Sequence, residues 1–95
     1  MSRTFGIEFS AHAKRQGDKL PQDWAGTQNN LGLALSDQGE RTTGEEGNRL
    51  LAEAVSAYRG ALEVYTQKNF PYLWNIAKRN LDTVLETLDQ RQKEK

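Results

Sequence analysis

The chain has 95 residues, no cysteine, and 13 basic residues that balance 13 acidic ones. This length suits one small domain, residues 1–95, whose stability must come from packing and not from disulfides. The neutral charge argues against nucleic acid as a partner, because neutralising phosphates needs an excess of lysine and arginine. No apolar run approaches the roughly 20 residues of a membrane span, so we expect a soluble, cytoplasmic protein without membrane contact.

The first expected element is a short helix over residues 4–17. Phe5, Phe9 and Ala13 recur at intervals of four, which is the spacing of one helix face. His12, the single histidine, lies in this stretch and belongs to neither a His-x-x-x-His nor a Glu-x-x-His metal pattern. We therefore interpret His12 as a surface residue and expect neither a metal nor a cofactor.

The second expected helix covers residues 21–38. Pro21 marks its start, because the first turn of a helix tolerates the missing N–H of proline. Gly39 follows as an expected C-terminal stop. Residues at spacings of three or four predict the buried face of this helix: Trp24, Gln28, Leu31 and Leu35.

The segment from Gln38 to Asn48 is predicted to be a loop. It holds three glycines and almost no apolar residue. Thr43 and Glu46 have the spacing of a capping box, which leaves an earlier start of the next helix open. These glycines lack the lysine of a phosphate-binding loop, and the acidic residues have no cleft that would separate their pKa values. We therefore do not expect an enzyme.

Two further helices are predicted, over residues 47–68 and 71–92. The first carries a long apolar stripe at helical spacing: Leu50, Leu51, Ala54, Val55, Tyr58, Ala61, Leu62 and Tyr65. The second starts at Pro71 and carries a similar stripe: Trp74, Ala77, Leu81, Val84, Leu85 and Leu88. The charged end of the chain, "DQRQKEK", is expected to fray.

The second and fourth expected helices repeat one another at an offset of fifty residues. Five positions are identical in the two copies: Pro21 and Pro71, Trp24 and Trp74, Asn30 and Asn80, Leu31 and Leu81, Leu35 and Leu85. Internal repeats of this length are typical of stacked helical units. We predict that the two helices run parallel, with the tyrosine-containing helix packed between them.

The repeat resembles the long bacterial variants of the tetratricopeptide (TPR) family. The residues that carry the resemblance are Leu31, Gly32 and Leu35 in one helix, with Ala54, Tyr58 and Ala61 in the next. The resemblance implies an all-α, TPR-like helical-hairpin solenoid of about four helices. The period is longer than the roughly 34 residues of the family, and Asp82 stands where the first copy has Gly32. This exchange suggests that the last helix has no ordinary partner following it.

The same resemblance implies a non-enzymatic protein–protein interaction module that binds a peptide segment in a groove. Asn30 and Asn80 recur in mid-helix, where asparagine is intrinsically disfavoured. By the resemblance they would bond the backbone of the bound peptide. The groove would also include Asn29, Leu33, Asp37, Arg79 and Thr83. The structural alternative, in which both asparagines bond a neighbouring helix, remains open.

A second hypothesis concerns self-assembly of a helical repeat fragment into a homodimer, a larger oligomer or a domain-swapped dimer with no separate ligand. The last helix carries apolar residues for which one chain offers few partners: Trp74, Ile76, Val84, Leu85 and Leu88. Burying a leucine contributes roughly 1.5–3 kcal/mol, so several exposed ones would favour association.

Overall fold

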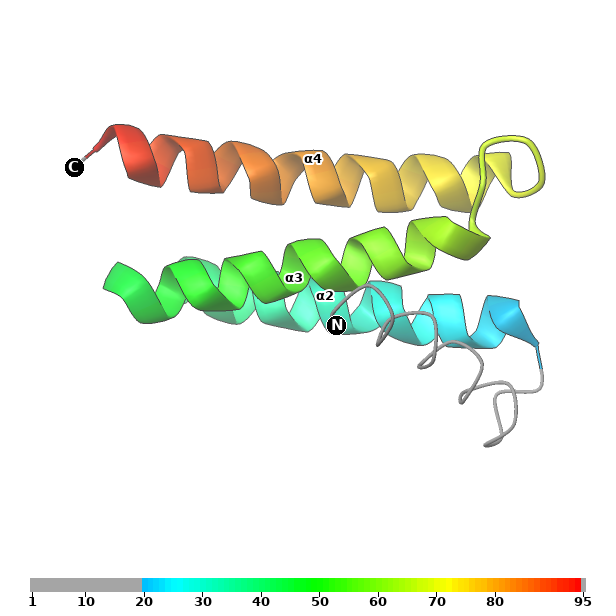
Figure 1. The fold of residues 1–95 in the computed structure, drawn as a ribbon, viewed down its shortest axis with the longest axis horizontal. Coiled ribbons are helices and arrows are strands. Elements are labelled where there is room, and N and C mark those ends of the chain that lie inside the picture. Colours follow the sequence, from blue (N-terminus) through cyan, green and yellow to red (C-terminus); the bar gives the residue numbers. More distant parts are fainter. Residues whose placement is uncertain (1–19, 95) are drawn as a thin grey trace, which may run out of the picture.

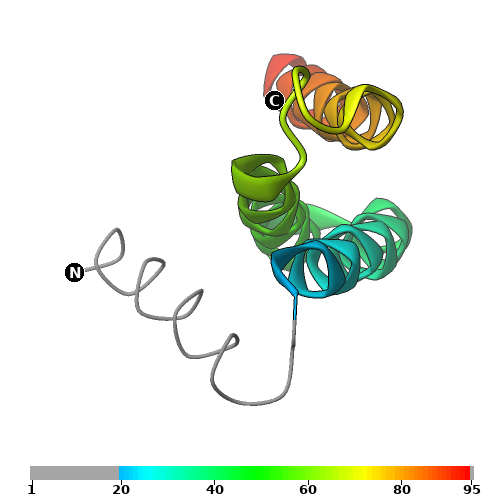
Figure 2. The same ribbon diagram turned by 90° about the vertical axis from the view of Figure 1, so that its right-hand side faces the viewer.

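The described part of the protein, residues 20–94 of a computed structural model, is an all-α array without strands. Helix α2 spans Pro21–Arg41, α3 spans Gly44–Val64 and α4 spans Pro71–Lys93. Helices α2 and α4 run in the same direction and α3 runs antiparallel to both (Figure 1). The end view places α2 and α4 on the same side of α3 (Figure 2). The helix expected over residues 4–17 lies outside the described residues.

The helix starts at the two prolines are confirmed, and both prolines occupy the first turn. The long apolar stripe on α3 is also confirmed, because most of its residues are buried. Helix α3 ends at Val64, before the predicted residue 68, and its C-cap residue Tyr65 has left the helical conformation with φ −79° and ψ 84°. The Tyr65 hydroxyl donates a hydrogen bond to the carbonyl oxygen of Gln22 in α2 at 3.2 Å. None of the three described helices combines the length and apolarity of a membrane span.

The prediction of a glycine-rich loop is wrong. Helix α2 continues to Arg41 and α3 begins at Gly44, so only two residues connect them. Gly39 does not end α2 but is buried against α3, where an added Cβ would lie 2.8 Å from Cγ of Leu51. The turn is made at Gly44, whose φ of 73° suits glycine. The earlier start of α3 is therefore the correct alternative, although its Thr43 cap makes no side-chain hydrogen bond.

Helix α2 packs on α3 mainly through small residues; of its leucines, only Leu35 packs against the core. Its buried face includes four small residues at helical spacing: Ala25, Gly32, Ser36 and Gly39. At Gly32 an added Cβ would lie 2.5 Å from the Cε1 atom of Tyr58, so the two backbones approach closely there. The expectation that Leu31 lies on the buried face is wrong, since its side chain is 45% exposed. A leucine would not fit where the two helices are this close.

Two apolar clusters form the core around α3. The larger cluster joins α3 to α4 through Leu51, Ala54, Val55, Tyr58, Leu81 and Val84, with Leu35, Leu62 and Leu88 packed against it. The smaller cluster joins α2 to α3 through Trp24, Ala25, Ala61 and Tyr65. Because α3 contributes to both clusters, it fixes the positions of α2 and α4 relative to one another.

Burial of the Tyr58 hydroxyl makes the stability of the fold sensitive to alkaline pH. Burial raises the pKa of this group, and a hydrogen bond with Ser36 offsets only part of the effect. The folded-state pKa therefore lies above the unfolded value of about 10. The contribution of the Tyr58 hydroxyl to stability is fully present below the unfolded-state pKa. It is lost as the pH rises through the folded-state pKa.

We expect Tyr58→Phe to lose less stability than the wild type between about pH 9 and pH 11. The reason is that the variant has no buried phenol to ionise at this position. Thermal melts followed by circular dichroism across this range would measure the difference. Tyr72→Phe, which removes an exposed hydroxyl, is the matched control and should follow the wild type. Parallel profiles for Tyr58→Phe and the wild type would contradict the prediction.

Candidate peptide-binding face

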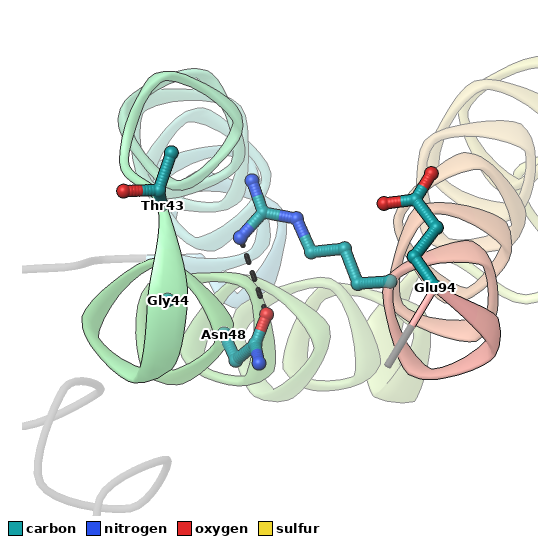
Figure 3. Close-up of a pocket in the computed structure, with 5 residues that line it drawn as sticks. Thr43, Gly44, Asn48 and Glu94 are labelled. Carbon is teal, nitrogen blue, oxygen red and sulfur yellow. Dashed lines mark hydrogen bonds between the residues drawn. The ribbon is translucent and has the colours of Figure 1, made fainter.

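Arg91, near the end of α4, joins all three described helices. Its Nη2 donates to the carbonyl oxygens of Gly39 at 2.8 Å and Glu40 at 3.4 Å, in the last turns of α2. Its Nη1 donates to Oδ1 of Asn48 in α3 at 3.2 Å, the bond drawn in Figure 3. A cation at this place also interacts favourably with the C-terminal end of the α2 dipole. The expectation that this charged tail frays is therefore wrong for Arg91.

The position of Arg91 identifies the flank of α4 that is turned toward α2. Residues three or four apart lie on one flank of a helix. Stepping back from Arg91 by these intervals gives Thr87, Thr83, Asn80 and Ile76. Two predicted peptide-binding residues, Asn80 and Thr83, therefore share this flank. Asn80 is half-buried and Thr83 is exposed. Arg79 is also exposed; it lies one turn before Thr83 and adjacent to Asn80, beside this flank.

The corresponding flank of α2 carries Asn29 and Leu33. The two residues are four apart and therefore lie on one side of the helix. Trp24 and Gln28 lie on the opposite flank of α2, where they pack beside Gly60 of α3. Helices α2 and α4 have few direct contacts, so side chains on these flanks line the surface between them. Asn30 and Asp37 are exposed and lie three and four residues from Leu33, at the edge of its flank.

We call this surface the α2–α4 face. It comprises Asn29, Asn30, Leu33 and Asp37 of α2 with Ile76, Asn80 and Thr83 of α4. Helical register places six of the seven residues that the sequence suggests for peptide binding on this face or at its edge, and Arg79 beside it. Leu33 is 46% exposed and is the main apolar group on the α2 part of the face.

The asparagines of this face differ from its other polar residues in their bonding. Asp37 pairs with Arg41 at 3.4 Å. The Thr83 hydroxyl donates to the carbonyl oxygen of Arg79 at 3.0 Å. Within residues 20–94, the side chains of Asn30 and Asn80 make no hydrogen bond to another residue. The structural alternative, in which both bond a neighbouring helix, has no support in this part of the chain.

The five residues suggested for self-association have different surroundings. Val84 is only 2% exposed and belongs to the larger core cluster, and Leu88 packs against that cluster. The expectation that these two lack partners within the chain is therefore wrong. Trp74 and Ile76 are half-buried. Leu85 is 38% exposed and is the most exposed of the five. The error arises because α3 has a second apolar side that accepts α4.

Helix α4 has a charged face where α2 has its small-residue face. The residues fifty positions after Ala25, Gly32, Ser36 and Gly39 are Asn75, Asp82, Glu86 and Asp89, and all four are exposed. Asp82 accepts a hydrogen bond from Nζ of Lys78 at 2.9 Å, and Asp89 pairs with Lys93 at 3.3 Å. Within residues 20–94, no helix packs on α4 in the way that α3 packs on α2.

A hollow of about 330 Å³ lies beside the first turn of α3 (Figure 3). Its lining consists of Thr43, Gly44, Asn48, Arg91 and Glu94. The Arg91 guanidinium is already bonded to Asn48 and to the end of α2. We interpret this place as the junction of the three helices. No pattern in the sequence predicts this junction, because two of the three acceptors of Arg91 are backbone carbonyls.

Comparison of the chain with protein-family models, with curated proteins and with solved structures gives no match. The assignment of a function therefore depends on the geometry of the α2–α4 face.

Proposed function

We propose that the chain is a non-enzymatic, TPR-like protein–protein interaction module of about four helices that binds an extended peptide segment across the α2–α4 face. The observation that supports this proposal best is the disposition of the repeated helices. They run parallel on the same side of α3, and the side chains of Asn30 and Asn80 make no bond within the described residues.

The chemistry of an amide suits the recognition of a peptide backbone. Each asparagine offers a carbonyl acceptor and two N–H donors, so it can bond both the N–H and the C=O of an extended segment. Main-chain bonds of this kind provide affinity, and apolar contacts to side chains add specificity. On this face Leu33 would make such an apolar contact.

The test is a double variant, Asn30→Ala with Asn80→Ala. Each lost hydrogen bond is worth about 1 kcal/mol, so affinity for a peptide selected on the wild type should fall by roughly 30-fold. The melting temperature should change little, because neither side chain is bonded within the described fold. Fluorescence anisotropy and thermal denaturation would measure the two effects.

Asn75→Ala is the matched control, since Asn75 is an exposed asparagine of α4 outside the α2–α4 face. It should leave the affinity unchanged. Equal losses of affinity and melting temperature in the double variant would assign the two asparagines a structural role and contradict the proposal.

Self-assembly is a weaker proposal than peptide binding. Burial of Val84 and Leu88 removes much of the apolar surface that motivated it. The exposed apolar residues that remain on α4 are Tyr72, Leu73 and Leu85. Sedimentation velocity that gives a monomer at high micromolar concentration would eliminate self-assembly.

A further inference from the structure

Helices α2 and α4 each carry a face at the same place in their repeated sequence, and within residues 20–94 only the face of α4 is covered. In α4 this face is buried or half-buried beside α3 and consists of Ala77, Leu81, Val84 and Leu88. The residues fifty positions earlier in α2 are all exposed: Thr27, Leu31, Ala34 and Gln38. We call these four residues the outer face of α2. The contrast is sharpest at the two identical residues, since Leu81 is 7% exposed and Leu31 is 45% exposed.

The repeat also indicates which segment of the chain could cover the outer face of α2. Helix α3, which covers the face of α4, directly precedes α4 in the sequence. The segment that directly precedes α2 is residues 4–17, for which the sequence predicts a helix. Its Phe5, Phe9 and Ala13 recur at intervals of four and would form one apolar stripe. A connection over residues 18–20 has a length typical of two antiparallel helices.

The distribution of charge favours the same segment. Residues 1–19 carry four basic and two acidic side chains, whereas the rest of the chain carries nine basic and eleven acidic ones. In an antiparallel pair, Lys14 and Arg15 would lie near the first turn of α2, where Asp23 is exposed. Opposite charges at a contact favour one partner and one register over others.

We infer that residues 4–17 of the same chain pack as an antiparallel helix on the outer face of α2, with Phe9 against Leu31. These two residues lie at about the same distance from the connection, so an antiparallel arrangement brings them together. Phe5 then lies near Ala34, whose small side chain leaves room for the ring. A strict fifty-residue repeat would turn Glu8 and His12 toward α2, so this helix is rotated by one residue relative to α3. The inference goes beyond peptide binding and does not depend on it.

Leu31 and Leu33 provide a matched pair for the test, because their exposed fractions of 45% and 46% are nearly the same. In the full chain, Leu31→Ala should lower the midpoint of urea denaturation by roughly 1 M, since it removes part of a packed contact. Leu33→Ala lies outside the outer face and should keep a midpoint near that of the wild type. Equal midpoints for the two variants would overturn the inference.

Double variants would identify the segment that covers Leu31. Phe9→Ala with Leu31→Ala should lower the midpoint by less than the sum of the single shifts, whereas Phe9→Ala with Leu33→Ala should be additive. Additivity in both pairs would overturn the inference. A wild-type midpoint that rises with protein concentration, with a dimer in sedimentation velocity, would assign the outer face to a second copy and would also overturn it.

Amide hydrogen exchange followed by NMR tests the same contact without a double variant that has to fold. Exchange at Phe9 should be slower than in the unfolded chain by about tenfold or more, both in the wild type and in Leu33→Ala. Leu31→Ala should lose most of this protection. An unprotected Phe9 amide in the wild type, or equal protection in the two leucine variants, would overturn the inference.

Discussion

Gly47→Ala is expected to destabilise the protein more than any other glycine-to-alanine change in residues 20–94. An added Cβ would lie 1.9 Å from the carbonyl oxygen of Thr42 and 2.5 Å from Nη1 of Arg91. The first of these atoms belongs to the backbone of the α2–α3 connection and cannot rotate away. We expect a loss of about 3 kcal/mol, the upper part of the range for overpacking. The intrinsic helix preference of alanine over glycine, about 1 kcal/mol, offsets only part of the collision.

Urea denaturation followed by circular dichroism would measure this loss. Gly60→Ala is the matched control on the same helix, since the nearest atom to its added Cβ is Cη2 of Trp24 at 3.3 Å. Its midpoint should stay near that of the wild type, because helix preference and mild crowding oppose one another. Similar midpoints for the Gly47 and Gly60 variants would show that an added Cβ at residue 47 does not collide with the α2–α3 connection.

Gly32→Ala should cause the second-largest loss of stability among these changes, because its added Cβ would collide with a side chain. Its Cβ would lie within 2.5 to 2.8 Å of three ring atoms of Tyr58. Tyr58 is 1% exposed and belongs to the larger core cluster, so its ring cannot turn outward into solvent without breaking core contacts. We expect a loss of about 2 kcal/mol, which for a domain of this size lowers the melting temperature by roughly 10 °C.

Two further variants would test whether the ring causes the loss. In Gly26→Ala, on the same helix, the one neighbour of the added Cβ among residues 20–94 is the Tyr65 hydroxyl at 3.3 Å, and the change should be nearly neutral. Combining Gly32→Ala with Tyr58→Leu should cost less than the sum of the two single changes, because the smaller side chain makes room. Strict additivity would rule out a direct collision between residues 32 and 58.

The all-α fold class and the helix starts could be predicted from the sequence, because the patterns that indicate them are local. Pro21 and Pro71 mark the first turns, and the apolar periodicity of α3 reflects burial on two sides. Glycine gave no such guidance. Gly44 makes the turn with its positive φ, whereas Gly39 and Gly47 permit close packing inside helices. The same residue type serves both purposes, so composition alone suggested one long loop.

The candidate site was predictable only in part. Periodicity placed Asn80 and Thr83 on one flank of α4, because their spacing depends on a single helix. The role of Arg91 could not be predicted, since it bonds the backbone carbonyl of Gly39, 52 residues earlier in the chain. A backbone acceptor leaves no trace in the identity of the residue that provides it. The burial of Val84 likewise depends on how α3 divides its apolar surface between two helices.

The acidic residues of α4 determine what can be added to this array. An antiparallel helix could approach α4 as closely as α3 approaches α2 only by covering Asp82, Glu86 and Asp89. The desolvation of three carboxylates without new partners would destabilise the packed state by far more than the helix contact would stabilise it. Engineered extension of the molecule by another hairpin would therefore have to begin by restoring glycine or serine at these positions.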